Sequence, residues 1–226
     1  MNMKTSIVVI IAVLILFLSE NIFPQVTDID GNVYKTVTIG NQVWTAENLD
    51  VSHYRNGDTI MQVDGNTEWE AQTSGGWCYF TLGSYNFYKD NLVNGECYGK
   101  LYNWYAVNDP RGLAPEGWHI PTPDDWKQLL DYLGGYEVAG SKMKTYATWQ
   151  SPTDKDINSS GFTIIYAGIR TLRGMFLDFD KYAYFWTANE DKDGSSWCYN
   201  LYAESTIFAI YTEAKEHGLS VRLVKD

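Results

Sequence analysis

The chain has 226 residues, with 9 Trp, 17 Tyr and 9 Phe among them, and a formal net charge of −11. This acidity excludes a nucleic-acid partner, because binding to a polyphosphate needs concentrated Lys and Arg, and it disfavours an anionic membrane surface for the same reason. The length and the lack of a low-complexity linker predict one domain over residues 26–226, after a leader of different composition.

Residues 1–25 have the pattern of a secretory signal peptide. One Lys precedes an unbroken apolar run from Ile7 to Leu18, and polar residues and a proline follow. The run is shorter than the roughly 20 residues that span a bilayer, and it has the length of a signal h-region. We expect cleavage near Gln25, with an uncleaved anchor as the alternative, and no other contact with a membrane. The body of the protein is therefore expected outside the cytoplasm.

Short β-rich runs between turn dipeptides indicate antiparallel strands. Residues 33–39 alternate in polarity, Gly40-Asn41 turns the chain, and the next run continues it, which predicts a hairpin over residues 33–46. Further strands are expected at residues 161–169, 196–202 and 219–224. Just before the hairpin, the run DIDGN (28–32) resembles the start of a calcium loop, but the sixth and twelfth positions that such a loop requires hold Val33 and Ile39. We expect a type I′ turn there.

The stretch GWHIPTPDDWKQLLDYLGG (117–135) combines tryptophans, a histidine and acids, yet each residue has a structural use. Thr122 and Asp125 have the spacing of a capping box, and Pro123 suits the first helical position. An apolar stripe at helical spacing follows, and a glycine ends it: Trp126, Leu129, Leu130, Leu133 and Gly134. We predict a helix over residues 123–133, with His119 facing outward or in a local hydrogen bond, and a shorter helix near residues 137–146. The fold class is therefore α+β, with short antiparallel strands, long loops and about two helices.

The three cysteines allow one disulfide outside the cytoplasm. Closeness in sequence favours Cys78–Cys97. A Cys78–Cys198 pair remains open, because both residues lie in similar Trp-Cys-Tyr runs, and so does a state with all three thiols reduced and buried. There is no Cys-x-x-Cys motif and the three His are far apart in sequence, so no metal site is expected from these residues.

Seven segments, in this order and at this spacing, resemble the Fibrobacter succinogenes major paralogous domain family. They are residues 28–49, 98–107, 112–135, 138–144, 160–170, 185–190 and 218–226, and they cover nearly the whole chain after the leader. The resemblance implies a bacterial protein that is secreted, displayed at the cell surface or held in the periplasm.

GWHIPTPDDW (117–126) and GLSVRLV (218–224) are also similar to segments of formylglycine-generating sulfatase-modifying enzymes. That similarity implies a C-type-lectin-like fold, in which the first and last strands pair. The hairpin at residues 33–46 would then neighbour the strand at 219–224, and the helix at 123–133 would pack against that sheet. The enzymes bind copper through two close cysteines, whereas Cys198 stands alone in the second half of this chain, so the activity is not implied.

One polar loop is the candidate binding site. The run NEDKDGSSW (189–197) links two expected strands, and Asn189, Glu190, Asp191 and Asp193 could bind a hard cation such as Ca²⁺ or the hydroxyls of a sugar, with Trp197 as an aromatic face. The alternative is a solvated acidic turn in front of a core strand. We expect no cofactor, with Ca²⁺ at this loop as the alternative.

The sequence contains no G-x-S-x-G, phosphate loop, H-E-x-x-H or dinucleotide motif, so no catalytic residue is assigned. We expect a non-catalytic binding or adhesion module whose partner is a glycan or an envelope protein. The alternatives are an enzyme related to the sulfatase modifiers or acting on glycans, and a structural envelope protein.

Overall fold

The computed structural model describes residues 24–82, 85–86, 98–145 and 157–226. Residues 1–23 of the predicted signal peptide lie outside this part of the chain, and Gln25, the predicted boundary, is the first residue of a strand. Among the described residues, none of the helices has the length and apolar character that a bilayer span requires.

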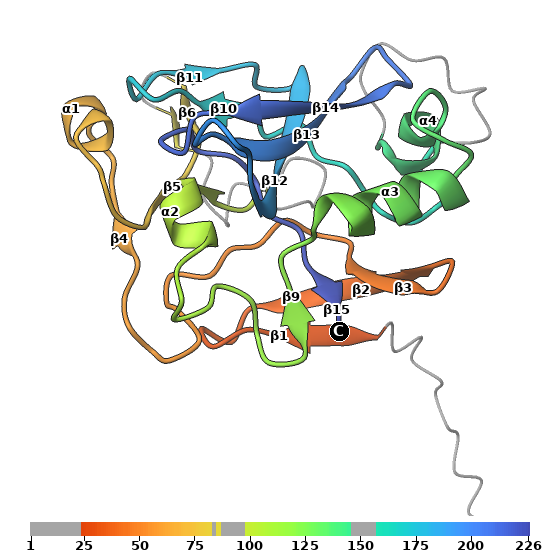
Figure 1. Cartoon of the computed structure of the whole chain (residues 1–226), viewed down its shortest axis with the longest axis horizontal. Helices are drawn as coiled ribbons and strands as arrows, with labels where there is room; N and C mark the ends of the chain where they lie inside the picture. The colour runs from red at the N-terminus through yellow and green to blue at the C-terminus, as the bar shows by residue number, and fades with distance from the viewer. Residues whose placement is uncertain (1–23, 83–84, 87–97, 146–156) are drawn as a thin grey trace, which may run out of the picture.

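A five-stranded antiparallel sheet forms the lower layer in Figure 1. Its order is β1-β2-β3-β15-β9, with bounds Gln25–Thr27, Val33–Ile39, Gln42–Thr45, Val224–Lys225 and Trp118–His119. The predicted hairpin is confirmed as β2–β3. The predicted neighbourhood of hairpin and final strand is confirmed too, because Val224 pairs with Trp44 on one side and with His119 on the other.

The upper layer contains smaller sheets (Figure 1). The largest is β12-β13-β14, with bounds Tyr182–Glu190, Ser196–Tyr202 and Phe208–Glu213, which confirms the strand predicted at residues 196–202. The others are β4-β5-β8 (Met61–Gln62, Gly76–Cys78, Leu101–Tyr102), β10-β11 (Ile169–Arg170, Phe176–Leu177) and β6-β7 (Thr81–Leu82, Tyr85–Asn86).

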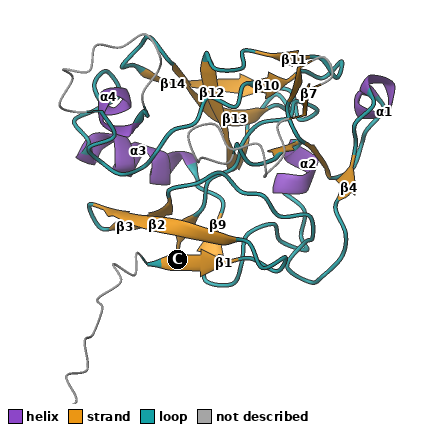
Figure 2. Cartoon of the chain, turned by 180° about the vertical axis from the view of Figure 1, so that it is seen from behind, coloured by secondary structure: helices purple, strands orange, loops and turns teal. Residues whose placement is uncertain are grey.

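The main helix lies between the two layers, as Figures 1 and 2 both show. This helix, α3 (Pro123–Tyr132), has the predicted capping box in full: the Thr122 hydroxyl accepts from the Asp125 N–H, and the Asp125 carboxylate accepts from the Thr122 N–H. The second predicted helix is α4 (Ala139–Met143). The described residues contain two more helices, α1 (Asn66–Glu70) and α2 (Trp104–Val107), which are too short to show helical periodicity in sequence.

Two predicted strands are largely irregular. Of residues 161–169 only Ile169 enters a strand, because Gly161, Thr163 and Gly168 have positive φ angles of 73°, 58° and 69° that break an extended chain. Of residues 219–223, Leu219 and Ser220 each form a single bridge, to Tyr102 and Phe185 respectively, and the strand itself begins at Val224. Both segments are buried, but each is held by separate contacts and not by one ladder.

The DIDGN run is a turn, but not of type I′. The Gly31 N–H donates to the Asp28 carbonyl (3.1 Å), and within the run only Gly31 has a positive φ, 80°, whereas type I′ needs two such residues. The Asp28 carboxylate faces inward and accepts from the Asp30 and Asn32 N–H groups and from the Tyr34 hydroxyl. Its oxygen atoms are therefore used by the turn.

The core is aromatic on both sides of α3. Trp126 is fully buried, and five rings have centroids 5.0–5.8 Å from its own: Trp44, Phe162, Phe185, Tyr199 and Phe208. These rings come from the lower sheet, from the irregular segment and from β12–β14. Trp126 therefore joins the two layers.

Two buried arginines bind backbone carbonyl groups of chain that lies outside the strands. The Arg222 guanidinium donates to Asn48 Oδ1 (2.7 Å) and to the carbonyl oxygens of Thr45 (2.9 Å), Phe162 (2.9 Å) and Thr163 (2.6 Å). Arg170 donates to carbonyl groups of the loop before α1 in the same manner. Each guanidinium therefore satisfies backbone groups that a regular ladder would otherwise pair.

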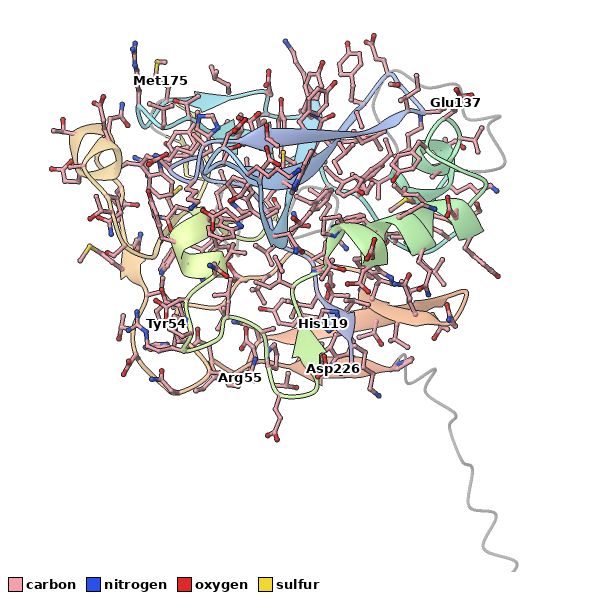
Figure 3. The ribbon with its side chains drawn as sticks, in the orientation of Figure 1. Tyr54, Arg55, His119, Glu137, Met175 and Asp226 are labelled. Carbon is pink, nitrogen blue, oxygen red and sulfur yellow. The ribbon has the colours of Figure 1, made fainter. Side chains whose placement is uncertain are left out.

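The capping box predicts a pH dependence of stability. Partial burial opposes ionisation of Asp125, but hydrogen bonds from Thr122 and His119 outweigh it and lower the pKa of this carboxyl below its ordinary value of 3.8. His119 also bonds Asp226 (2.7 Å), and Figure 3 shows both at the lower sheet. The Asp125 carboxylate is protonated less readily in the folded state than in the unfolded state. The stabilisation from its hydrogen bonds is therefore present above pH 3.8 and is lost as the pH falls through the pKa of the folded state.

We expect Asp125→Asn to lower the free energy of unfolding near neutral pH, with the difference from wild type shrinking as the pH falls below 3.8. Urea denaturation at a series of pH values measures this difference. Asp124→Asn, on an exposed neighbour outside the box, is the control. A difference between Asp125→Asn and wild type that stays constant down to about pH 2 contradicts the assignment.

Candidate functional site

The predicted loop is the turn of the β12–β13 hairpin. The Asp191 N–H donates to the Ser195 carbonyl (2.7 Å), which closes the turn. Asn189, Glu190 and Asp193 are exposed, and the Glu190 carboxylate forms an ion pair with Lys215 from the loop after β14. An ion pair therefore joins the turn to the loop after β14, a contact that the sequence pattern does not predict.

The acids of this turn do not converge on one point. In the part of the chain that the structure describes, no three His, Cys, Asp or Glu side chains are grouped so that they could hold a metal ion. Trp197 is half-buried in β13 opposite Thr212 of β14. Of the predicted residues, Asp193 lines an open depression, whereas Asn189, Glu190, Asp191 and Trp197 do not line it.

This first depression has a volume of about 430 Å³. Three segments far apart in sequence form it, and its lining residues are Tyr105, Asp193, Gly194, Ser195, Ala214, Lys215 and Glu216. The lining offers carboxylates, a hydroxyl and one aromatic ring. These groups can accept and donate hydrogen bonds to a polar ligand without a metal.

Tyr105 has a fixed position in this depression. Its hydroxyl donates to Glu216 Oε1 (2.8 Å), and the Glu216 carbonyl in turn accepts from the indole N–H of Trp69 (2.8 Å). Burial and the Glu216 carboxylate raise the pKa of Tyr105 to about 12. The hydroxyl is therefore protonated at neutral pH and keeps the half-buried ring in one orientation.

Asn103 places the helix that carries Tyr105. Its side-chain oxygen accepts from the Gly76 N–H (2.9 Å) and caps α2 at Ala106 N (3.1 Å), while its amide donates to the Ser74 carbonyl (2.8 Å). The loop before β5 is thereby fixed beside α2. An Asn at an N-cap is readable from sequence, but the partner loop is not.

A second depression of about 310 Å³ lies between this loop and α2. Its lining residues are Thr73, Ser74, Gly75, Trp104, Tyr105, Asn108, Asp109 and Pro110, so Tyr105 belongs to both depressions. Arg111 holds the Asp109 carboxylate (Nε–Oδ1 2.8 Å), and its hydrogen bond lowers the pKa of that carboxyl. We call the two depressions together the Tyr105 surface.

The cysteines do not contribute to this surface. Cys78 and Cys198 are buried and are not bonded to each other, so the alternative pair between them is not formed. Burial raises the pKa of a Cys78 thiol to about 12, which disfavours the reactive thiolate at neutral pH. Cys97 lies outside the described residues, so the predicted Cys78–Cys97 disulfide stays a prediction.

The fold and this surface define the class of protein: an α+β domain, mainly of antiparallel strands, whose loops form an open polar surface. A family model described as the Fibrobacter succinogenes major domain matches residues 37–225, and the chain belongs to that family. The resemblance drawn from the seven sequence segments is thereby confirmed. Neither the curated proteins nor the solved structures contain a significant match.

Proposed function

We propose that this protein is an exported, non-catalytic binding module of the bacterial cell surface or periplasm, and that it recognises a glycan through the Tyr105 surface. The signal-like leader and the lack of catalytic motifs in the sequence support this proposal. As part of it we assign the chain a C-type-lectin-like fold, which the pairing of the final strand with the first hairpin supports.

One observation carries the proposal: Tyr105 is held by Glu216 and bordered by Asp193, Ser195 and Asn108. A sugar presents hydroxyl groups around an apolar ring face. Carboxylate and amide groups bind such hydroxyls, and a rigid tyrosine ring loses little conformational entropy when it packs against the ring face. The surface is open and most of its lining residues are polar, whereas sites for apolar small molecules are enclosed and mainly apolar.

We expect Tyr105→Ala to weaken glycan binding about tenfold or more. Retention of the full chain on insoluble polysaccharides and on a glycan array, each with and without a calcium chelator, identifies the ligand and tests for Ca²⁺. Tyr105→Phe keeps the ring but loses the hydrogen bond to Glu216, so an intermediate loss is expected.

Tyr132→Ala is the matched control, because this exposed tyrosine lies on α3 and lines neither depression. Equal binding by wild type and Tyr105→Ala would move the site away from this surface. Failure of wild type to bind any glycan would overturn the proposed function, and capture of an envelope protein instead would replace the glycan as partner.

A further inference from the structure

We infer, on the basis of the proposed function, that the ligand is an oligosaccharide of at least two sugar units, neutral or carrying amino groups, that crosses Tyr105 and occupies both depressions. Neither the family nor the sequence assigns such a ligand. Three observations lead to it: the arrangement of the two depressions, the charged groups in them that have no ion-pair partner among the described residues, and the close packing beneath the second depression.

The arrangement favours a chain over a single unit. Tyr105 lines both depressions, whose volumes of about 430 and 310 Å³ lie at the lower end of the range for small-molecule sites. A single sugar can fill only one of them. A linked pair can place one unit beside Asp193 and Ser195 and the next beside Thr73 and Asn108, with Tyr105 between them.

The free charge on the surface is negative. Lys215 is taken by Glu190, and the guanidinium of Arg111 is shared by Asp109 and Asp58. Among the described residues Asp193 has no ion-pair partner, and the Glu216 carboxylate accepts from the neutral Tyr105 hydroxyl. The surface therefore repels a carboxylated or sulfated chain and favours a ligand that donates hydrogen bonds, from hydroxyl or ammonium groups.

The floor of the second depression is closely packed. Gly75 packs so closely that a methyl group at this position would lie 1.9 Å from the Tyr54 hydroxyl and 3.1 Å from Cα of Ala106. Tyr54 is buried beneath Gly75, and Figure 3 shows it near the lower end of α2. Because these residues are already packed against one another, we expect a second sugar unit to bind at little entropic cost for ordering the loop.

A basic extended peptide also donates hydrogen bonds, but the surface fits it less well. Peptide partners are usually held by a large side chain in a deep apolar pocket. Here the largest aromatic, Trp104, is only 3% exposed, and hydroxyl, amide and carboxylate groups supply the remaining contacts. A sugar chain uses such groups along its whole length.

Calorimetry with the full chain and defined oligomers tests the inference. The probes are one to six units of glucose, N-acetylglucosamine and glucosamine, with galacturonate oligomers as the anionic series and a lysine-rich peptide as the competing class. We expect at least one neutral or amino series to gain tenfold or more in affinity from one unit to two or three units. Galacturonate of equal length is expected to bind at least tenfold more weakly.

Thr73→Trp, which fills the second depression from an exposed position, should abolish the gain with length but keep the binding of one unit. Thr38→Trp, at an exposed position of β2, should change neither. An affinity independent of length but sensitive to Asp193→Ala would overturn the inference and leave the proposed function intact. Tighter binding of galacturonate or of the peptide would also overturn it. If no glycan binds, polysaccharides included, both this inference and the proposed function are wrong.

Discussion

Replacing Arg222 by alanine is expected to lower the free energy of unfolding by about 3–5 kcal/mol. The guanidinium is fully buried and donates to Asn48 and to the carbonyl groups of Thr45, Phe162 and Thr163. Removing it leaves several acceptors without water or a donor, and it also removes the packing against the Phe162 ring (4.8 Å). Urea denaturation followed by circular dichroism measures the change.

Two further variants complete the test: one separates the geometry of the guanidinium from its charge, and the other is a surface control. Arg222→Lys keeps the positive charge, but a single ammonium group cannot donate to all of the acceptors that the guanidinium reaches. We therefore expect Arg222→Lys to be only slightly more stable than Arg222→Ala. Arg173→Ala, at an exposed position, should stay within about 0.5 kcal/mol of wild type. A loss below about 1 kcal/mol for Arg222→Ala would show that the irregular segments do not depend on this side chain.

Replacing Trp126 by alanine is expected to cost about 3–5 kcal/mol, the range for a large aromatic removed from a core. The ring joins the two layers of the fold through five aromatic neighbours, and a cavity there cannot collapse without moving both sheets. Near-ultraviolet circular dichroism should lose intensity together with the fall in the denaturation midpoint.

Trp126→Phe is the informative companion. The Trp126 indole N–H has no hydrogen-bond partner among the described residues. Phenylalanine removes this unsatisfied donor but keeps an aromatic ring in the core, so we expect Trp126→Phe to lower the free energy of unfolding clearly less than Trp126→Ala does. Tyr132→Ala, on the exposed face of the same helix, measures how much of the stability change comes from altered helix propensity and not from lost core packing. Equal losses for Trp126→Ala and Tyr132→Ala would contradict a core role for Trp126.

Local chemistry explains why parts of the fold could be predicted from sequence. The capping box of α3 uses residues three positions apart, and the β2–β3 hairpin turns at Gly40-Asn41, so both signals lie within a few residues. The strand predicted at residues 161–169 is wrong because positive φ angles break it, and one of its carbonyl groups, that of Thr163, accepts from Arg222, a residue 59 positions away. A β-rich composition does not record such a partner.

The candidate site shows the same limit. Asp193 was predicted from the polarity of its loop, and it does line a depression. Tyr105 and Glu216 were missed, although Tyr105 lies in a segment that carries the family resemblance, because their hydrogen bond joins residues 111 positions apart. Only the tertiary structure brings the loops at residues 73–75, 108–110, 193–195 and 214–216 to one tyrosine.

The position of β15 has a consequence for biosynthesis. This strand is inserted between β3 and β9, and the backbone N–H of Asp226 donates to the Gly117 carbonyl (3.0 Å). The lower sheet cannot close until residues 224–226 have left the ribosome, since Val224 bridges strands made earlier in synthesis. Strands β3 and β9 therefore lack their shared neighbour until late in synthesis, and the sheet forms through contacts between residues far apart in sequence.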